Sequence, residues 1–203
     1  MVLKMDMEKA FDRMEWNYIL AILIKLGFHS SWVNWIKICI SSPSFSILIN
    51  GSPFGHFSPA RGFRQGDPLS PFLFILGSEV LSRLLFKEEA AGCLKGLKIA
   101  RRCPAISHLL FADDLLIFGR ASISEAACIK ACLAKYSTWS GQSINANKSS
   151  IFFSKIPPTP LPPPFYLSSL TFAIPQISLS WSPNSVWPFL IRWVSKHSRK
   201  SAR

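Results

Sequence analysis

The chain has 203 residues, of which 49% are hydrophobic, so it can bury the core of one ordinary domain and is not disordered as a whole. Its 23 Lys and Arg residues against 11 Asp and Glu residues give a net charge of +12, which favours a polyanionic partner such as nucleic acid or an anionic membrane surface. Residues 1–125 hold all the acids and a net charge of +3, whereas residues 126–203 hold nine basic residues and no acid.

The cysteine spacing and the N-terminal residues indicate the cellular compartment in which the protein is expected to reside. The five cysteines form neither a CxxC pair nor a Cys/His cluster with finger-like spacing, so neither a structural zinc site nor a disulfide framework is expected. Charged residues at Lys4, Asp6, Glu8 and Lys9 interrupt any apolar run of a signal peptide. We therefore expect a reducing compartment and no secretion, with nuclear and cytoplasmic residence both open.

A proline-rich segment follows residue 155. Residues 156–191 carry no charge, but nine prolines lie between Pro157 and Pro188. Because a proline inside a helix costs about 3 kcal/mol, a membrane-spanning helix is not expected there. Residues 155–203 are expected to form a basic, irregular and poorly ordered tail, and membrane association through this tail is a weaker alternative.

The predicted elements begin with a strand over residues 1–6 and a helix that starts after Asp12 and runs to about Leu26. Asp12, with a glutamate three residues later, is typical of a helix N-cap, and Gly27 is expected to end the helix. Asp12 is therefore interpreted as a structural residue.

A second helix and a β-hairpin are predicted next. Ser30 or Ser31 can cap a helix that runs through Cys39. Residues 44–50 alternate as a strand, and Asn50-Gly51 is a strong signal for a two-residue hairpin turn. Residues 54–60 can return as the partner strand.

The remaining elements complete an α+β order. Asp67 and Pro68 are expected to begin a helix that ends near Gly92. Apolar strands over residues 106–111 and 115–118 flank a tight turn, and they are followed by a helix from about 122 to 139 and a strand over 149–153. This order predicts an antiparallel sheet with helices packed on one face.

Three carboxylates are the candidate site. Asp113 and Asp114 are adjacent between apolar strands, and two such charges ~4 Å apart repel by roughly 4 kcal/mol at an effective dielectric constant of 20. A bound divalent cation would relieve this repulsion, although aspartates in turns also simply bond the local backbone. Asp6 ends the first strand and could meet the pair, which would create an oxygen site suited to Mg²⁺ and phosphate.

Three segments resemble successive palm motifs of reverse transcriptases, in the form used by LINE-type (non-LTR) retrotransposons. They are KMDMEKAFD from Lys4, RGFRQGDPLSP from Arg61 and FADD from Phe111, and SGQSINANKS from Ser140 resembles the motif that follows them. The resemblance covers residues 1–154, in the family's order. It implies a reverse-transcriptase-like palm over 1–154 with the fingers missing, followed by the tail over 155–203 in place of a thumb.

The resemblance implies catalytic roles for four residues. Asp6 and Asp113 would be the principal metal ligands and Asp114 the supporting carboxylate, holding two Mg²⁺ or Mn²⁺ ions. Lys148 would donate a proton to the departing pyrophosphate.

It also implies substrate contacts. Phe11 would lie under the sugar of the incoming dNTP and exclude a 2′-hydroxyl, although spacing alone favours a core phenylalanine. Gln65 and Gly66 would face the nascent base pair, and Arg61 and Arg64 would contact template or phosphate unless they are simply solvated.

Two functions follow as expectations. The first is an RNA-directed DNA polymerase, a nucleotidyltransferase of retrotransposon origin whose partners are an RNA template, a DNA primer and dNTP, with no membrane. The second is a catalytically incompetent fragment that retains only nucleic-acid binding, motivated by the missing fingers and thumb and by the basic C-terminal part.

Overall fold

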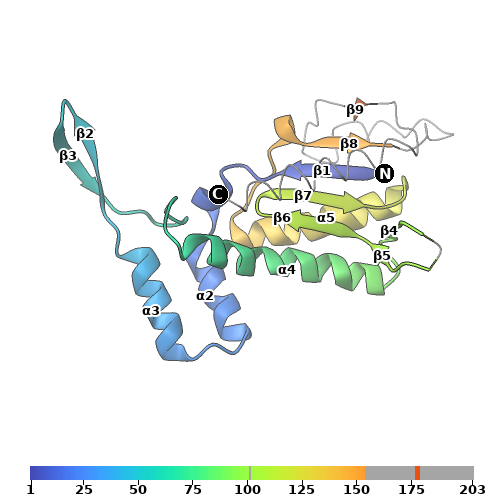
Figure 1. The fold of residues 1–203 in the computed structure, drawn as a ribbon, viewed down its shortest axis with the longest axis horizontal. Coiled ribbons are helices and arrows are strands. Elements are labelled where there is room, and N and C mark those ends of the chain that lie inside the picture. Colours follow the sequence, from blue (N-terminus) through green and yellow to red (C-terminus); the bar gives the residue numbers. More distant parts are fainter. Residues whose placement is uncertain (101, 154–176, 179–203) are drawn as a thin grey trace. The chain divides into compact units, whose positions relative to one another are not determined.

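The computed structural model describes residues 1–100, 102–153 and 177–178 (Figure 1). The chain divides into two compact units. Of the described residues, the first contains 1–7, 82–100, 102–132, 144–153 and 177–178, and the second contains 8–81 and 133–143. Two long helices, α4 (Ser70–Ala90) and α5 (Ile123–Ser140), contribute residues to both units.

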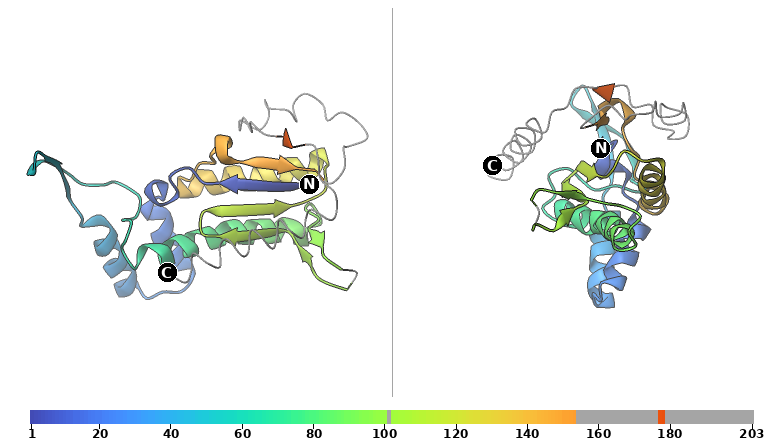
Figure 2. Two further views of the ribbon diagram at one scale, coloured as in Figure 1. Left: turned by 45° about the horizontal axis from the view of Figure 1, so that its top comes forward. Right: turned by 90° about the vertical axis from the view of Figure 1, so that its right-hand side faces the viewer.

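A mixed sheet organises the first unit. Its strands lie in the order β6 (His108–Phe111), β7 (Asp114–Phe118), β1 (Val2–Asp6), β8 (Ser150–Phe152) and β9 (Ile177–Ser178). The pairs from β6 to β8 are antiparallel, whereas β8 and β9 are parallel. Figures 1 and 2 show β1 between β7 and β8.

One face of this sheet packs against α4. Leu3 and His108 both pair with Ile117, so all three side chains lie on the same face. The His108 ring lies 2.7 Å from the Ser82 hydroxyl and forms an edge contact with Phe86, and both partners belong to α4. The predicted α+β fold is confirmed: the sheet is antiparallel from β6 to β8, as expected, and α4 covers one of its faces, whereas the parallel pairing of β8 with β9 was not predicted.

The opposite face changes character along the strands. At one end, Val2, Leu116 and Phe118 form a buried apolar cluster. At the other end, the same face of β1 and β7 carries Asp6 and Asp114. Acidic side chains thus lie beside an apolar surface that lowers the local dielectric constant.

The second unit contains a three-helix segment and a hairpin. Its elements are α1 (Ala10–Arg13), α2 (Trp16–Lys25), α3 (Ser30–Ser41), β2 (Phe45–Ile49) and β3 (Ser52–Phe57), together with the N-terminal part of α4. Gly77 of α4 permits close approach of α2, because a Cβ there would lie 2.9 Å from the Ile19 side chain. The Tyr18 hydroxyl donates to the Gly77 carbonyl oxygen at 2.8 Å.

The predicted hairpin is confirmed at its turn. Asn50 and Gly51 both have positive φ angles, of 50° and 83°, as a two-residue turn between β2 and β3 requires. Both strands are largely exposed, including Leu48 and Phe54 at 71% each.

Smaller elements complete the described residues. β4 (Leu97–Lys98) pairs with β5 (Ala105–Ile106), and the 3-10 helix η1 (Ala146–Lys148) precedes β8. The sequence predicted neither β9 nor η1. Apart from β9, the tail predicted over 155–203 lies outside the described residues.

Helix starts differ from their predictions. Asp12 does not cap α2, because Lys9 adopts a left-handed conformation that begins the extra helix α1, and Asp12 lies inside it. The N-cap of α3 is His29, whose Nδ1 accepts from the Ser31 amide. Asp67 accepts from the Leu69 amide at 2.9 Å, but α4 begins only at Ser70.

Among the described residues, no helix combines the length and the apolar composition that crossing a membrane requires. The uncharged segment 156–191, apart from 177–178, lies outside that part of the chain.

Candidate active site

The three predicted carboxylates lie at one end of the sheet of the first unit. Asp6 at the end of β1 is the register partner of Asp114 at the start of β7. Phe111 and Asp114 close the β6–β7 hairpin, so Ala112 and Asp113 form its turn, with Ala112 at a φ of 52°. Asp113 is exposed, whereas Asp6 and Asp114 are partly buried. The structure therefore brings together residues that are more than a hundred positions apart.

The electrostatic environment of Asp6 reflects this arrangement. Burial raises the pKa of Asp6, and the negative charges of Asp113 and Asp114 raise it further. The positive charges of Lys148 and, more weakly, Lys4 lower it. The site is a cluster of acids in which like charges repel, and such a cluster is stabilised by a cation.

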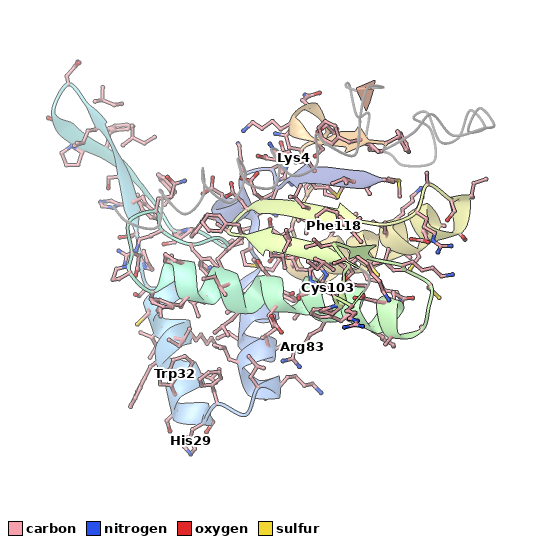
Figure 3. The ribbon with its side chains drawn as sticks, turned by 45° about the vertical axis from the view of Figure 1, so that its right-hand side comes forward. Lys4, His29, Trp32, Arg83, Cys103 and Phe118 are labelled. Carbon is pink, nitrogen blue, oxygen red and sulfur yellow. The ribbon has the colours of Figure 1, made fainter. Side chains whose placement is uncertain are left out.

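The two lysines reach Asp6 from different elements. Lys148 is exposed at the end of η1. Lys4 is labelled in Figure 3. It lies two residues before Asp6 in β1, so the period of the strand places both side chains on the same face. The motif resemblance indicated Lys148 but missed Lys4, although the two-residue period of a strand could have identified it.

The donor set fits a hard divalent cation. Carboxylate oxygens are the ligands that Mg²⁺ prefers, and Mg²⁺ usually completes its shell with water and substrate phosphates. In the part of the chain that the structure describes, no three His, Cys, Asp or Glu side chains are arranged as a ready metal-binding group. Asp6, Asp113 and Asp114 therefore do not form a shared ligand set in this structure.

The other predicted site residues belong to the second unit. Phe11 is partly buried in α1 and stacks on Phe74 of α4, with ring centroids 4.9 Å apart and an interplanar angle of 12°. The Phe11 carbonyl oxygen accepts from the Phe63 amide at 2.8 Å. Its ring is thus held rigidly by a core residue, and its backbone supports the loop that carries Arg64, Gln65 and Gly66.

That loop is anchored at its start and open at its tip. The Gly62 amide donates to the Met14 carbonyl oxygen at 2.8 Å, and the Trp16 indole donates to the Gly62 carbonyl oxygen at 2.7 Å. Gln65 and Gly66 are exposed, and no atom lies within 4 Å of a Cβ built on Gly66. A base pair or phosphate can therefore approach this part of the backbone.

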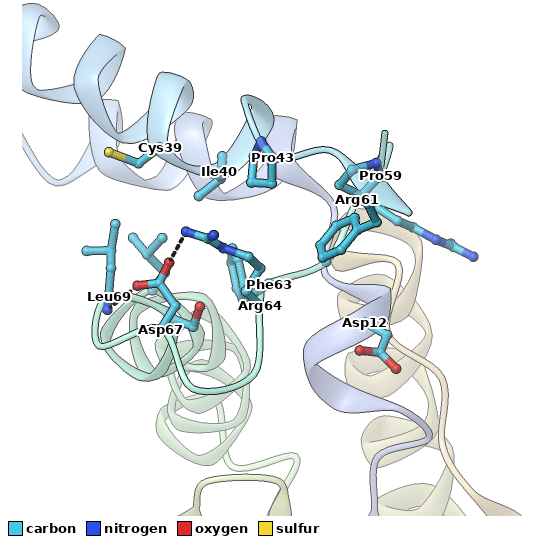
Figure 4. Close-up of a pocket in the computed structure, with 14 residues that line it drawn as sticks. Asp12, Cys39, Ile40, Pro43, Pro59, Arg61, Phe63, Arg64, Asp67 and Leu69 are labelled. Carbon is cyan, nitrogen blue, oxygen red and sulfur yellow. Dashed lines mark hydrogen bonds and ion pairs between the residues drawn. The ribbon is translucent and has the colours of Figure 1, made fainter. Parts of the chain in front are cut away.

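Arg64 lines a cavity of about 170 Å³ beside this loop (Figure 4). Its guanidinium donates to Asp67 at 3.1 Å, and both side chains line the cavity with Arg61 and Asp12. Arg64 is thus held by an ion pair in this structure, so contact with a template phosphate would require it to share or release Asp67.

Solved structures with a similar fold include those of telomerase. The structure of apo telomerase from Candida tropicalis, truncated from its C-terminal domain, matches 73% of this chain and 29% of its own length with a TM-score of 0.55 and 16% identity. Telomerase from Candida albicans, in complex with a fragment of telomeric RNA, matches with a TM-score of 0.54 and 15% identity over 73% of this chain and 27% of its own length. At these identities, the likeness establishes the fold.

Sequence relatives include proteins of mobile elements and a mitochondrial protein. An uncharacterized mitochondrial protein of Arabidopsis thaliana is 55% identical over 33% of this chain and 55% of its own length. The Pol polyprotein of retrotransposable element R2 from Popillia japonica is 32% identical over 73% of this chain, which spans 20% of that polyprotein. The 149 kDa protein of transposon TX1 from Xenopus laevis is also 32% identical over 73% of this chain and 11% of its own length.

The family reverse transcriptase (RNA-dependent DNA polymerase) matches residues 1–187. The chain therefore belongs to this family, and its R2 and TX1 relatives confirm the predicted kinship with non-LTR retrotransposons. The match continues past residue 154, where the motif resemblance ended. The chain spans about half of the Arabidopsis relative and a fifth or less of the R2 and TX1 proteins named here.

Proposed function

We propose that the chain carries the nucleotidyl-transfer centre of an RNA-directed DNA polymerase, which joins a dNTP to a DNA primer on an RNA template. The observation that carries the proposal is the pairing of Asp6 with Asp114 across β1 and β7, with Asp113 in the adjoining turn. The mutual effect of these acids on the Asp6 pKa supports one shared site.

The acids would hold two divalent cations, Mg²⁺ or Mn²⁺. When bound, these ions lower the pKa of the primer 3′-hydroxyl and neutralise charge on the triphosphate. In the reaction, the 3′-hydroxyl would release its proton to solvent and its oxygen would form a bond with the α-phosphorus, while the bond from that phosphorus to the bridging oxygen breaks and pyrophosphate departs. Lys148 donates a proton to the departing pyrophosphate.

The second unit would select the substrate. Phe11, braced by Phe74, presents an aromatic wall to the sugar and disfavours a 2′-hydroxyl by steric exclusion. Gln65 and the unobstructed backbone at Gly66 would face the nascent base pair, and Arg64 would meet template or phosphate.

A primer-extension assay tests the proposal. The full chain, a DNA primer annealed to an RNA template, dNTPs and Mg²⁺ should yield extended primer. Asp113→Asn should reduce extension by at least about a hundredfold, because one acid of the site is removed. Glu89→Gln removes a carboxylate on α4 and should match the wild-type chain. Equal extension by all three proteins, or none by the wild-type chain, would refute the proposal.

A second candidate function is binding of nucleic acid without catalysis. It is favoured by the nine basic residues and the absence of acids over residues 126–203. It predicts RNA binding whose affinity falls steeply with salt, with no nucleotide incorporation. Replacing the five basic residues from Arg192 to Arg203 with glutamine should then lower the slope of log affinity against log salt, by up to about 0.7 for each phosphate that is no longer neutralised. An unchanged slope would exclude that segment as the binding element.

A further inference from the structure

The segment 144–149 is joined to β1 at its acidic end. Ile144 forms an isolated antiparallel bridge with Met7, and the Asn145 amide donates to the carbonyl oxygen of Asp6 at 2.9 Å. Both hydrogen-bonding groups of the Asp6 backbone are engaged by this segment, because the Asp6 amide donates to the Ser149 hydroxyl at 3.3 Å.

The Ser149 side chain accepts the hydrogen bond that a backbone carbonyl of β8 would accept if the strand pairing continued to Asp6. The register between β1 and β8 ends with Lys4 opposite Ser150, so Asp6 lies beyond the last pair. The Ser149 side chain is 2% exposed, and its hydroxyl accepts from Asp6 while donating to the Asn145 carbonyl oxygen at 2.7 Å. A single buried hydroxyl therefore connects the end of β1 to the start of the turn.

Asn145 organises that turn from its other side. Its Oδ1 accepts from the amides of Asn147 and Lys148 at 3.1 and 3.3 Å and caps η1. Asn145 thus holds Asp6 through its backbone and the base of Lys148 through its side chain.

We propose that Asn145 and Ser149 form a positioning clip, which fixes the backbone of Lys148 beside Asp6 so that the lysine is held ready at the reacting phosphates. A turn that served only to connect α5 to β8 would satisfy its own backbone groups, whereas this turn also occupies the amide and the carbonyl of Asp6. The catalytic consequence rests on the proposed function, while the clip itself is a statement about local structure.

Amide hydrogen exchange tests the clip without any need for activity. Asn145→Ala should accelerate exchange of the Asn147 amide at least about tenfold, because its acceptor is removed. Ser149→Ala should do the same at the Asp6 amide, and the conservative variants Asn145→Asp and Ser149→Thr should restore protection at each site. Asn147→Ala, which alters an exposed neighbour, should leave the Asp6 amide unchanged. Unaltered exchange in the folded Asn145→Ala and Ser149→Ala proteins would overturn the clip.

A double-mutant cycle tests its role in the reaction. Asn145→Ala should lower kcat about tenfold and change the KM for dNTP by less than about twofold, because the lysine is displaced but the binding groups remain. In a Lys148→Gln background, Asn145→Ala should add less than about twofold. Effects that multiply in the double variant would show that Asn145 does not act through Lys148.

The results distinguish failure of the proposed function from failure of the positioning role. If the wild-type chain incorporates no nucleotide, the proposed function and the catalytic role of the clip both fall, and the exchange data alone decide the local structure. If incorporation occurs but the cycle is multiplicative, the proposed function stands and the positioning role is refuted.

Discussion

Gly62 marks the closest approach between α1 and the loop that carries Arg64. Its φ is +83°, and a Cβ there would lie 2.6 Å from the Asp12 carbonyl oxygen. Gly66 has a similar φ of +87° but open space around its Cβ position. Substitutions at the two glycines therefore distinguish the cost of the left-handed backbone, which both share, from the cost of a steric clash, which arises only at Gly62.

Alanine substitutions should differ at these two positions. Gly66→Ala carries only the left-handed backbone cost and should lower the free energy of unfolding by about 1 kcal/mol. Gly62→Ala also forces the Asp12 backbone to move and should cost at least about 2 kcal/mol more. Urea unfolding followed by tryptophan fluorescence measures both, and equal losses would show that the loop does not press against α1.

Cys128 should react slowly with alkylating agents. Burial raises the pKa of its thiol to about 12, and the hydrogen bond to Glu88 adds to the effect. The Cys128 thiol of the folded protein therefore stays protonated through about pH 8–9, where the same thiol ionises in the unfolded chain. Its contribution to the free energy of unfolding is complete below the unfolded pKa and is lost as the pH rises through about 12.

Mass spectrometry after iodoacetamide treatment at about pH 8.5, near the ordinary thiol pKa, gives the comparison. Cys39, which is exposed, should be modified first, and Cys128 should lag behind it. Glu88→Gln removes the charge that opposes ionisation and should accelerate modification of Cys128 but not of Cys39. Equal rates for both thiols in the wild-type protein would contradict the assigned environment.

At the scale of elements, Gln142 links the end of α5 to α1. The side chain is 3% exposed and its Nε2 donates to the Ala10 carbonyl oxygen at 2.7 Å. Gln142→Ala should lower the free energy of unfolding by about 2 kcal/mol, because a buried carbonyl loses its donor. Gln65→Ala, at an exposed position, should change it by less than about 0.5 kcal/mol. Thermal unfolding measures both variants, and equal losses of stability would show that the hydrogen bond from Gln142 to Ala10 does not stabilise the fold.

Elements with local signals were predictable, and elements set by tertiary contacts were not. The hairpin followed from Asn50-Gly51, whose turn chemistry is local. By contrast, α1 depends on a left-handed Lys9, and β9 exists only through its partner β8. Propensity along the chain carries no signal for either.

The same distinction applies to the candidate site. The FADD motif located Asp113 and Asp114 from sequence, but the register that places Asp6 opposite Asp114 is a long-range property of the sheet. The hydrogen bond from the Asp6 amide to the Ser149 hydroxyl could not be predicted from the sequence either. Nothing in the sequence indicates that the amide at the end of β1 takes its acceptor from a side chain.

At the scale of the whole molecule, acidic residues are confined to the first part of the chain. All the acids, including the three at the candidate site, precede residue 126, and all the charged residues in 126–203 are Lys or Arg. Under the proposed function, the excess positive charge of residues 126–203 would attract the nucleic acid.

Binding of Mn²⁺, followed by electron paramagnetic resonance, tests directly whether the three carboxylates act as one site. A shared site requires that Asp6→Asn and Asp114→Asn each weaken Mn²⁺ affinity at least about tenfold, whereas Glu89→Gln leaves it unchanged. One common affinity for the wild-type chain and both aspartate variants would contradict a joint metal site at the paired ends of β1 and β7.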